Sequence, residues 1–232
     1  MIQRTWQYSA NHLPNDYSPK ILVLGDSHAI VFKNKKFREA FKNYLFKVGY
    51  VDGATVSGLS NPHSKTNALK IFKYYITRLQ PDITITLLGE VDVGFVIWYR
   101  AKKYNAEIRA MFDMAINNYQ ALLKFISTSS RAICISTPLP TISDDNDWGD
   151  VANKRKEIDA TQLERTRLTL KFNNHMKTFC DEQNFIYLSF DNESIGDDGM
   201  VIPKLVNSQL NNHHYDADNY SDMIIDKLKL WL

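Results

Sequence analysis

Short apolar runs alternate along the chain with longer segments in which apolar residues recur every three or four positions. The runs are residues 20–24, 45–51, 83–88, 132–136 and 185–190. Runs of this length without polar alternation are typical of strands buried on both faces of a parallel sheet. Spacing typical of amphipathic helices extends over residues 29–44, 64–79, 105–126, 161–183 and 219–230.

This alternation predicts a three-layer α/β/α fold around a five-stranded, mainly parallel sheet. No stretch rich in Gly, Ser or Pro divides the chain, so we expect one domain over residues 20–232, preceded by a polar arm over residues 1–19. Two prolines and several acidic residues in residues 137–150 predict a surface loop.

Composition excludes several classes of protein. The 232 residues are 44% hydrophobic and 23% charged, as in ordinary globular proteins. A net charge of +2 gives no reason to expect a nucleic-acid partner. No apolar run reaches the roughly 18 residues of a membrane span, so we expect no membrane partner; the oligomeric state is left open.

The two cysteines and the N-terminus bear on the compartment. Cys134 and Cys180 have no metal-binding or redox spacing, and two buried free thiols fit a reducing cytoplasm. Residues 1–20 are polar and contain Pro14, so they lack the apolar stretch of a signal peptide. We therefore expect a cytoplasmic location.

Candidate chemistry follows the predicted strands. In open parallel sheets the ligand crevice lies beyond the carboxyl ends of the strands. Four segments qualify by this rule, namely residues 25–28, 55–61, 89–92 and 211–218.

Ser27 is the candidate nucleophile in these segments. A serine in a strand-to-helix turn commonly caps the helix, and that is the alternative for Ser27. A nucleophilic serine needs a base and donors for an oxyanion. His214 is a candidate base, and Gly58 offers a backbone N–H that a reacting group can approach closely.

These residues carry a resemblance to a known family. Ile-Leu-Val-Leu-Gly-Asp-Ser, which ends at Ser27, resembles the first block of the SGNH (GDSL) hydrolases. The segment His-Tyr-Asp-Ala-Asp-Asn-Tyr, residues 214–220, is similar to the last block. Gly58 and residues 89–92 lie where the second and third blocks are expected, so the resemblance extends over the whole chain in the correct order.

The resemblance implies a flavodoxin-like fold with Ser27 as nucleophile and His214 as general base. It also implies an oxyanion hole made by the backbone N–H groups of Ser27 and Gly58, with no cofactor and no metal ion. The implied activity is that of an esterase or O-acyltransferase, acting through an acyl-enzyme on Ser27. The implied substrate is a small acyl ester, most simply an acetyl ester, with a carbohydrate as one implied carrier.

Two positions depart from the family pattern. The oxyanion-binding Asn of the family is replaced by Val91, and Asn61 is a candidate substitute. The family has Asp three residues before its histidine, where this chain has Asn211. Asn can still hold an imidazole in one tautomer, so Asn211 is the candidate orienter.

Other residues of the last block remain alternatives. Asp216 or Asp218 could orient His214 instead of Asn211. His213 is a second candidate base, but Leu210 stands three residues before it and cannot orient an imidazole.

Residues 89–103 offer candidates for substrate binding. Glu90, Asp92, Trp98 and Arg100 could line the crevice. Trp98 would stack on a sugar or acyl group, although a large aromatic side chain is more often packed in the core.

Two other functions remain open. The departures at Val91 and Asn211 fit a non-catalytic descendant that binds a ligand in the same crevice. A metal-dependent phosphoesterase would instead use carboxylates and imidazoles as ligands. Its candidate ligands are Asp26, His28, His213, His214, Asp216 and Asp218.

Overall fold

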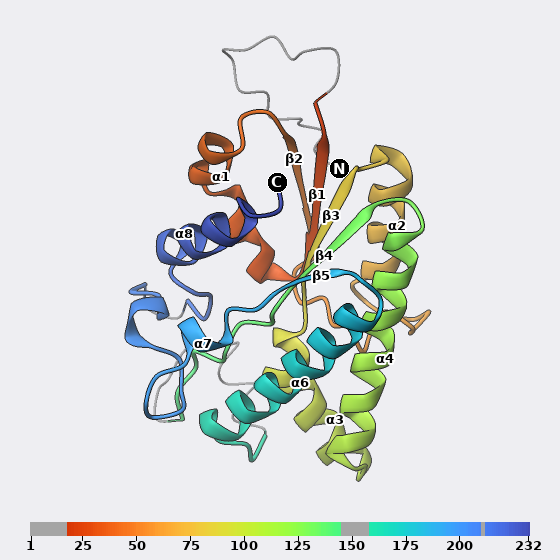
Figure 1. Cartoon of the computed structure of the whole chain (residues 1–232). Coiled ribbons are helices and arrows are strands. Elements are labelled where there is room, and N and C mark those ends of the chain that lie inside the picture. Colours follow the sequence, from red (N-terminus) through yellow and green to blue (C-terminus); the bar gives the residue numbers. More distant parts are fainter. Residues whose placement is uncertain (1–17, 145–157, 210–211) are drawn as a thin grey trace.

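The computed structural model describes residues 18–144, 158–209 and 212–232, and its centre is a five-stranded parallel sheet (Figure 1). The strand order is β2-β1-β3-β4-β5. The strands are β1 (Lys20–Gly25), β2 (Leu45–Tyr50), β3 (Ile83–Leu87), β4 (Arg131–Ile135) and β5 (Ile186–Leu188). All five predicted strands are confirmed, and every pairing is parallel.

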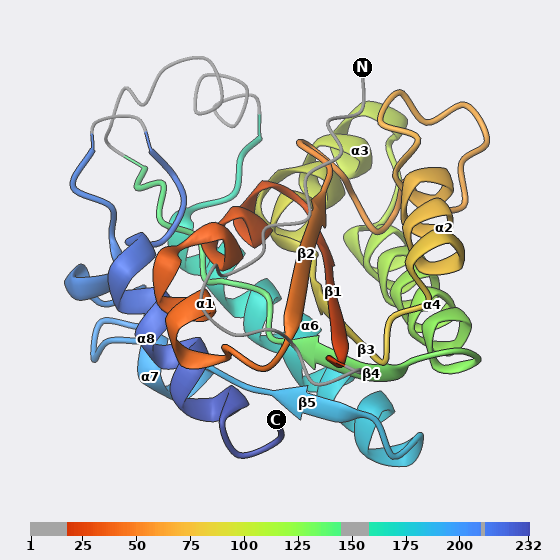
Figure 2. The ribbon, with the colours of Figure 1, turned by 90° about the horizontal axis from the view of Figure 1, so that it is seen from above.

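Helices cover both faces of the sheet. The α-helices are α1 (Lys35–Ala40), α2 (Ala68–Leu79), α3 (Ile97–Tyr104), α4 (Ile108–Ser127), α6 (Gln162–Glu182), α7 (Asp191–Ser194) and α8 (Ala217–Leu228). The other helices are the 3₁₀ segments η1 (Ser27–Lys33) and η3 (Pro203–Leu205), and the π-helix η2 (Asp92–Val96). Figures 1 and 2 show α1 and α8 on one face, and α2, α4 and α6 on the other.

The hydrophobic core follows from this layering. Successive residues of β1 point to opposite faces, so Leu22 and Leu24 pack with α2, α4 and α6, while Ile21 and Val23 pack with η1, α1 and α8. Both faces are apolar and buried, which explains why the strands are continuous apolar runs. The predicted three-layer α/β/α fold is confirmed.

Three segments differ from the sequence prediction. The helix expected over residues 29–44 is divided into η1 and α1, because the side chain of Asn34 accepts the Lys36 N–H and starts a new helix. Residues 92–104 form η2 and α3, which the sequence did not predict. Residues 137–142 are buried, so this part of the predicted surface loop is wrong; residues 145–157 lie outside the described residues.

The strand order places the candidate residues at one edge of the sheet. Gly25 pairs with Tyr50 of β2 and with Leu87 of β3, so these three strands end side by side. The chain leaves β1 toward β2 on one side and later returns to β3 on the other. In open parallel sheets, ligands commonly bind beyond the strand ends at such a reversal, and Ser27 follows β1 at that point.

Gly25 makes the turn into η1 possible. A Cβ atom at this position would lie 2.4 Å from the Leu87 carbonyl oxygen and 2.5 Å from the Ala29 Cβ. Both distances are shorter than van der Waals contact, so no side chain fits here. The glycine of the Gly-Asp-Ser sequence therefore lets β1, β3 and η1 approach closely.

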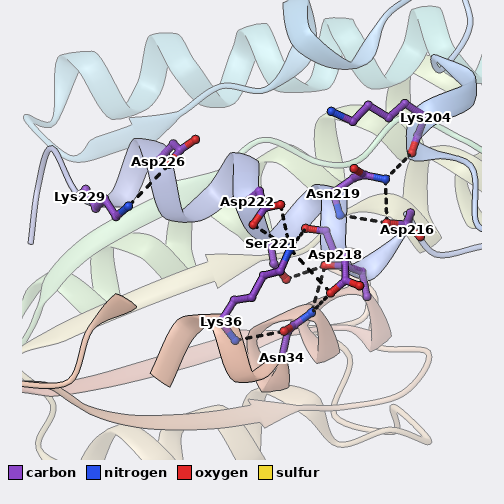
Figure 3. A network of polar contacts seen from close by, with 11 residues as sticks. Asn34, Lys36, Lys204, Asp216, Asp218, Asn219, Ser221, Asp222, Asp226 and Lys229 are labelled. Atoms are coloured by element: carbon purple, nitrogen blue, oxygen red, sulfur yellow. Dashed lines mark hydrogen bonds and ion pairs between the residues drawn. The ribbon is translucent and has the colours of Figure 1, made fainter. Parts of the chain in front are cut away.

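Polar contacts hold α8 against α1, as Figure 3 shows. Lys36 Nζ lies 2.8 Å from Asp222 Oδ2, and Asn34 Nδ2 donates to Asp218 Oδ1 at 2.8 Å. Because α1 follows the Ser27 turn and α8 follows His214, these contacts help to fix the two halves of the candidate site relative to each other.

Two expectations drawn from composition concern the thiols and the membrane. Cys134 and Cys180 are both buried and free, as expected. Among the described helices, none has both the length and the apolar character needed to traverse a bilayer. Residues 1–17 of the predicted arm lie outside the described residues.

Candidate active site

Ser27, which follows β1, and His214 are in contact although 187 residues separate them. The Ser27 Oγ lies 2.9 Å from the His214 Nε2. Ser27 is the first residue of η1, and Asp26, not Ser27, is the residue that caps this helix. The capping alternative for Ser27 is therefore wrong, and its hydroxyl is directed at an imidazole.

Asn212 sets the tautomer of His214. Its Oδ1 lies 3.0 Å from His214 Nδ1 and also accepts the His214 backbone N–H at 3.1 Å. Its amide nitrogen donates to Gln209 Oε1 at 3.2 Å, which fixes which end of the amide faces the ring. A carbonyl oxygen can only accept, so Nδ1 carries the proton and Nε2 keeps a lone pair for the Ser27 hydroxyl.

The orienting residue thus lies one position after the predicted one. Asn211 lies outside the described residues, so its predicted role stays a prediction. Asp216 caps α8 through the Asn219 N–H, and Asp218 binds Asn34. The alternative that one of these carboxylates orients His214 is wrong, because Asn212 holds Nδ1.

A buried polar cluster lies behind the serine. Asp26 accepts the His28 N–H at 2.9 Å, and His28 Nε2 lies 3.3 Å from Glu90 Oε2. Burial raises the pKa of Asp26 to about 7, although His28 opposes the shift. Glu90 was predicted to line the crevice; its side chain is only 2% exposed and lies against His28. Its role in substrate binding stays a prediction.

Asp92 is a tether for the loop of residues 55–61. Its carboxylate accepts the backbone N–H groups of Val56 at 2.7 Å and Ser57 at 3.0 Å. Burial raises its pKa to about 6, while the hydrogen bonds from Ser57 and Val56 and the nearby Arg100 charge oppose the shift. Asp92 is fully buried, so its observed contacts are with the loop.

Two further side chains hold the same loop. Arg100, from α3, donates to Ser57 Oγ at 2.9 Å. Asn118, from α4, donates to the Ser57 carbonyl at 3.3 Å and to Ser60 Oγ at 3.0 Å. No sequence pattern indicates a role for Asn118, because it lies within a long amphipathic helix far from any motif.

The candidate oxyanion donors differ in the hydrogen bonds that they already make within the protein. The Ser27 N–H is at the start of η1, where helical N–H groups have no intrahelical partner. The Gly58 N–H instead donates to the carbonyl and hydroxyl oxygens of Thr55, at 3.1 and 3.0 Å. Asn61 is exposed, and its side-chain oxygen accepts the His63 N–H. Gly58 and Asn61 therefore stay predictions as donors.

Trp98 has a structural contact of its own. Its Nε1–H donates to the Val93 carbonyl at 2.7 Å, within the π-helix η2. This bond fixes the indole against the backbone that carries Asp92. The contact favours packing over stacking on a ligand, and its role in substrate binding stays a prediction.

The segment that carries His214 is anchored by residues that the sequence did not single out. Tyr215 Oη accepts the Leu139 N–H at 2.7 Å, and Thr141 Oγ1 donates to the His213 carbonyl at 2.6 Å. Residues 137–142 are buried because they pack and form hydrogen bonds against the segment that carries His214.

Comparison with solved structures supports the fold. No protein-family model matches the chain, and no curated protein matches it. Among solved structures, a GDSL-like lipase from Bacteroides thetaiotaomicron is 13% identical, with a TM-score of 0.58 over 94% of this chain and 89% of that one. An acetyl xylan esterase is 11% identical, with a TM-score of 0.54 over 91% of this chain and 98% of that one.

A third similar structure is a proposed acylhydrolase from Bacteroides fragilis. It is 10% identical, with a TM-score of 0.62 over 94% of this chain and 88% of that one. The chain therefore has the three-layer fold of the SGNH/GDSL hydrolases, as the resemblance implied.

Proposed function

We propose that this protein is a serine-dependent esterase or O-acyltransferase that acts on a small acyl ester. The observation that carries the proposal is the aligned series Ser27–His214–Asn212, with 2.9 Å between Oγ and Nε2 and 3.0 Å between Nδ1 and the amide oxygen. Nucleophile, base and orienter are the parts that acyl transfer needs.

The reaction follows from this geometry. Ser27 Oγ attacks the ester carbonyl while His214 Nε2 takes its proton, and the Ser27 N–H donates to the developing oxyanion. His214 then returns the proton to the departing alcohol, which leaves an acyl group on Ser27. Water or a second hydroxyl attacks this acyl-enzyme, and that choice distinguishes hydrolysis from transfer.

Asn212 is a positioning residue in this scheme. Its carbonyl dipole holds the productive tautomer, but it supplies no full charge to the imidazolium that forms on His214. A slower reaction than that of an enzyme with a carboxylate at this position is expected.

The substrate class rests on the neighbours and on charge. One structure with this fold is an acetyl xylan esterase, which supports an acetyl ester on a carbohydrate. The net charge of +2 on 232 residues gives no general attraction for a polyanion. We therefore include acetylated carbohydrate as the substrate class of the proposal.

Labelling with a fluorophosphonate probe tests the nucleophile. We expect the wild-type protein to gain one adduct on Ser27, located by mass spectrometry of its peptides. Ser27→Ala should lose both the adduct and the turnover of an aryl acetate, whereas Ser189→Ala, just after β5, should keep both. An unlabelled wild-type protein would favour the non-catalytic ligand-binding alternative.

A further inference from the structure

Three histidine rings gather beside the proposed nucleophile. His28 comes from η1, and His213 and His214 come from the segment before α8. The ring centroids lie 4.3 Å apart for His213–His214, 4.6 Å for His28–His214 and 5.6 Å for His28–His213. One nitrogen of each ring lies within 4.8 Å of the others.

This arrangement has the chemistry of a transition-metal site. Imidazole nitrogens suit Zn²⁺, Cu²⁺ and Ni²⁺, and three histidines with an open fourth position are a common zinc ligand set. Zinc–nitrogen bonds of about 2.0–2.1 Å place tetrahedral ligand atoms about 3.4 Å apart. The nitrogens must therefore approach by about 1.4 Å at most, and the half-buried rings of His213 and His214 can make that movement.

Glu90 adds a second observation. Its carboxylate lies 3.3 Å from His28 Nε2, and both side chains are buried. A carboxylate on one ring nitrogen orients a histidine and makes the ring a stronger ligand for zinc.

We propose that His28, His213 and His214 form a binding site for Zn²⁺, and that the bound cation inhibits acyl transfer. The inhibitory part rests on the proposed function. Because Asn212 holds Nδ1–H, Nε2 is the nitrogen of His214 that carries a lone pair. That same lone pair accepts the Ser27 proton, so zinc and catalysis compete for one atom.

The contacts of Asp216 and Asp218 argue against the two-metal site of a phosphoesterase. Asp216 caps α8 and Asp218 binds Asn34 at the α1–α8 contact. These two carboxylates are directed at other partners, so the ligand set of the phosphoesterase alternative is not assembled in the part of the chain that the structure describes.

The first experiment measures zinc binding by titrating zinc chloride into the full chain in an isothermal titration calorimeter. We expect one Zn²⁺ per chain, with an affinity that falls at least about tenfold in His213→Ala. His175→Ala removes an exposed histidine of α6 and should bind as the wild type does. Binding that His213→Ala and His28→Asn leave unchanged would overturn the site.

The activity arm measures turnover of an aryl acetate against zinc concentration. We expect zinc to inhibit the wild type and a chelator to restore it. With turnover expressed relative to each protein's own zinc-free rate, the half-inhibiting zinc concentration should be at least about tenfold higher for His213→Ala than for the wild type. Zinc that raises wild-type turnover, or inhibits both proteins equally, would overturn the inhibitory role.

Ser27→Ala separates this inference from the proposed function. The variant should lose turnover and still bind zinc, because no Ser27 atom is a ligand. If the wild type shows no turnover of any ester, the proposed function fails, while calorimetry still decides whether the three histidines bind zinc.

Discussion

At the scale of single residues, the proposed mechanism depends most on Asn212. We expect Asn212→Ala to lower kcat by at least about tenfold, because His214 loses the acceptor that selects its tautomer. Asn212→Asp should retain kcat or raise it, since a carboxylate holds the same tautomer and adds charge stabilisation. Steady-state kinetics with an aryl acetate measures both, and KM should change less than kcat.

Asn211→Ala is the matched control for Asn212. It should leave kcat within about twofold of the wild type if Asn212 alone orients the ring. A larger loss in Asn211→Ala than in Asn212→Ala would restore the original prediction. The sequence could not decide between these neighbours, because a fixed count back from His214 ignores how the backbone turns.

The roles of some other residues could not be predicted from the sequence, because those roles depend on how the backbone folds. Ser27 and His214 could be predicted because each lies in a short local motif at a strand end. The roles of Asp92 and Asn118 depend on partners 36 and 61 positions away. No local pattern indicates such partners, so burial of Asp92 and its loop contacts emerged only from the fold.

At the scale of elements, the loop of residues 55–61 depends on η2, α3 and α4. We expect Asp92→Ala to leave the buried N–H groups of Val56 and Ser57 without an acceptor. Each such loss costs about 1–3 kcal/mol, so urea denaturation should show a lower free energy of unfolding. Turnover should fall as well, because the loop that carries Gly58 is no longer fixed.

Asp113→Ala is a suitable control for Asp92. Asp113 is on α4 and pairs with Arg109 at the surface, where such pairs contribute at most about 1 kcal/mol. If Asp92→Ala proves as stable and active as this control, Asp92 is not a tether. Strands were easier to predict than such tethers, since a buried strand is apolar throughout and its pattern is local.

At the scale of the whole molecule, the layering explains which parts of the fold can be predicted from the sequence. Apolar runs and helical spacing fix the order of strands and helices, and parallel order brings the strand ends together. Residues 137–142 are polar or proline-rich in sequence yet buried. They are buried because α6 and the His214 segment supply hydrogen-bonding partners, such as Tyr215 for Leu139 and Gln162 for Pro140.

Buried carboxyl groups also predict how the stability of the whole molecule depends on pH. Burial raises the pKa from 3.8 to about 7 for Asp26, and to about 6 for both Asp92 and Asp191. A raised pKa means that the folded state binds the proton more tightly than the unfolded state. The stabilisation is therefore complete below about pH 4 and is lost as the pH rises through 6 to 7.

Asp26→Asn tests this contribution at the most strongly shifted group. Asparagine keeps the acceptor for the His28 N–H but cannot ionise, so the variant should be more stable than the wild type at pH 8, by on the order of 1–3 kcal/mol, and by a smaller amount at pH 5. Chemical denaturation at the two pH values measures this, with exposed Asp197→Asn as the control. A stability difference that is the same at pH 5 and pH 8 would show that Asp26 is not the titrating group.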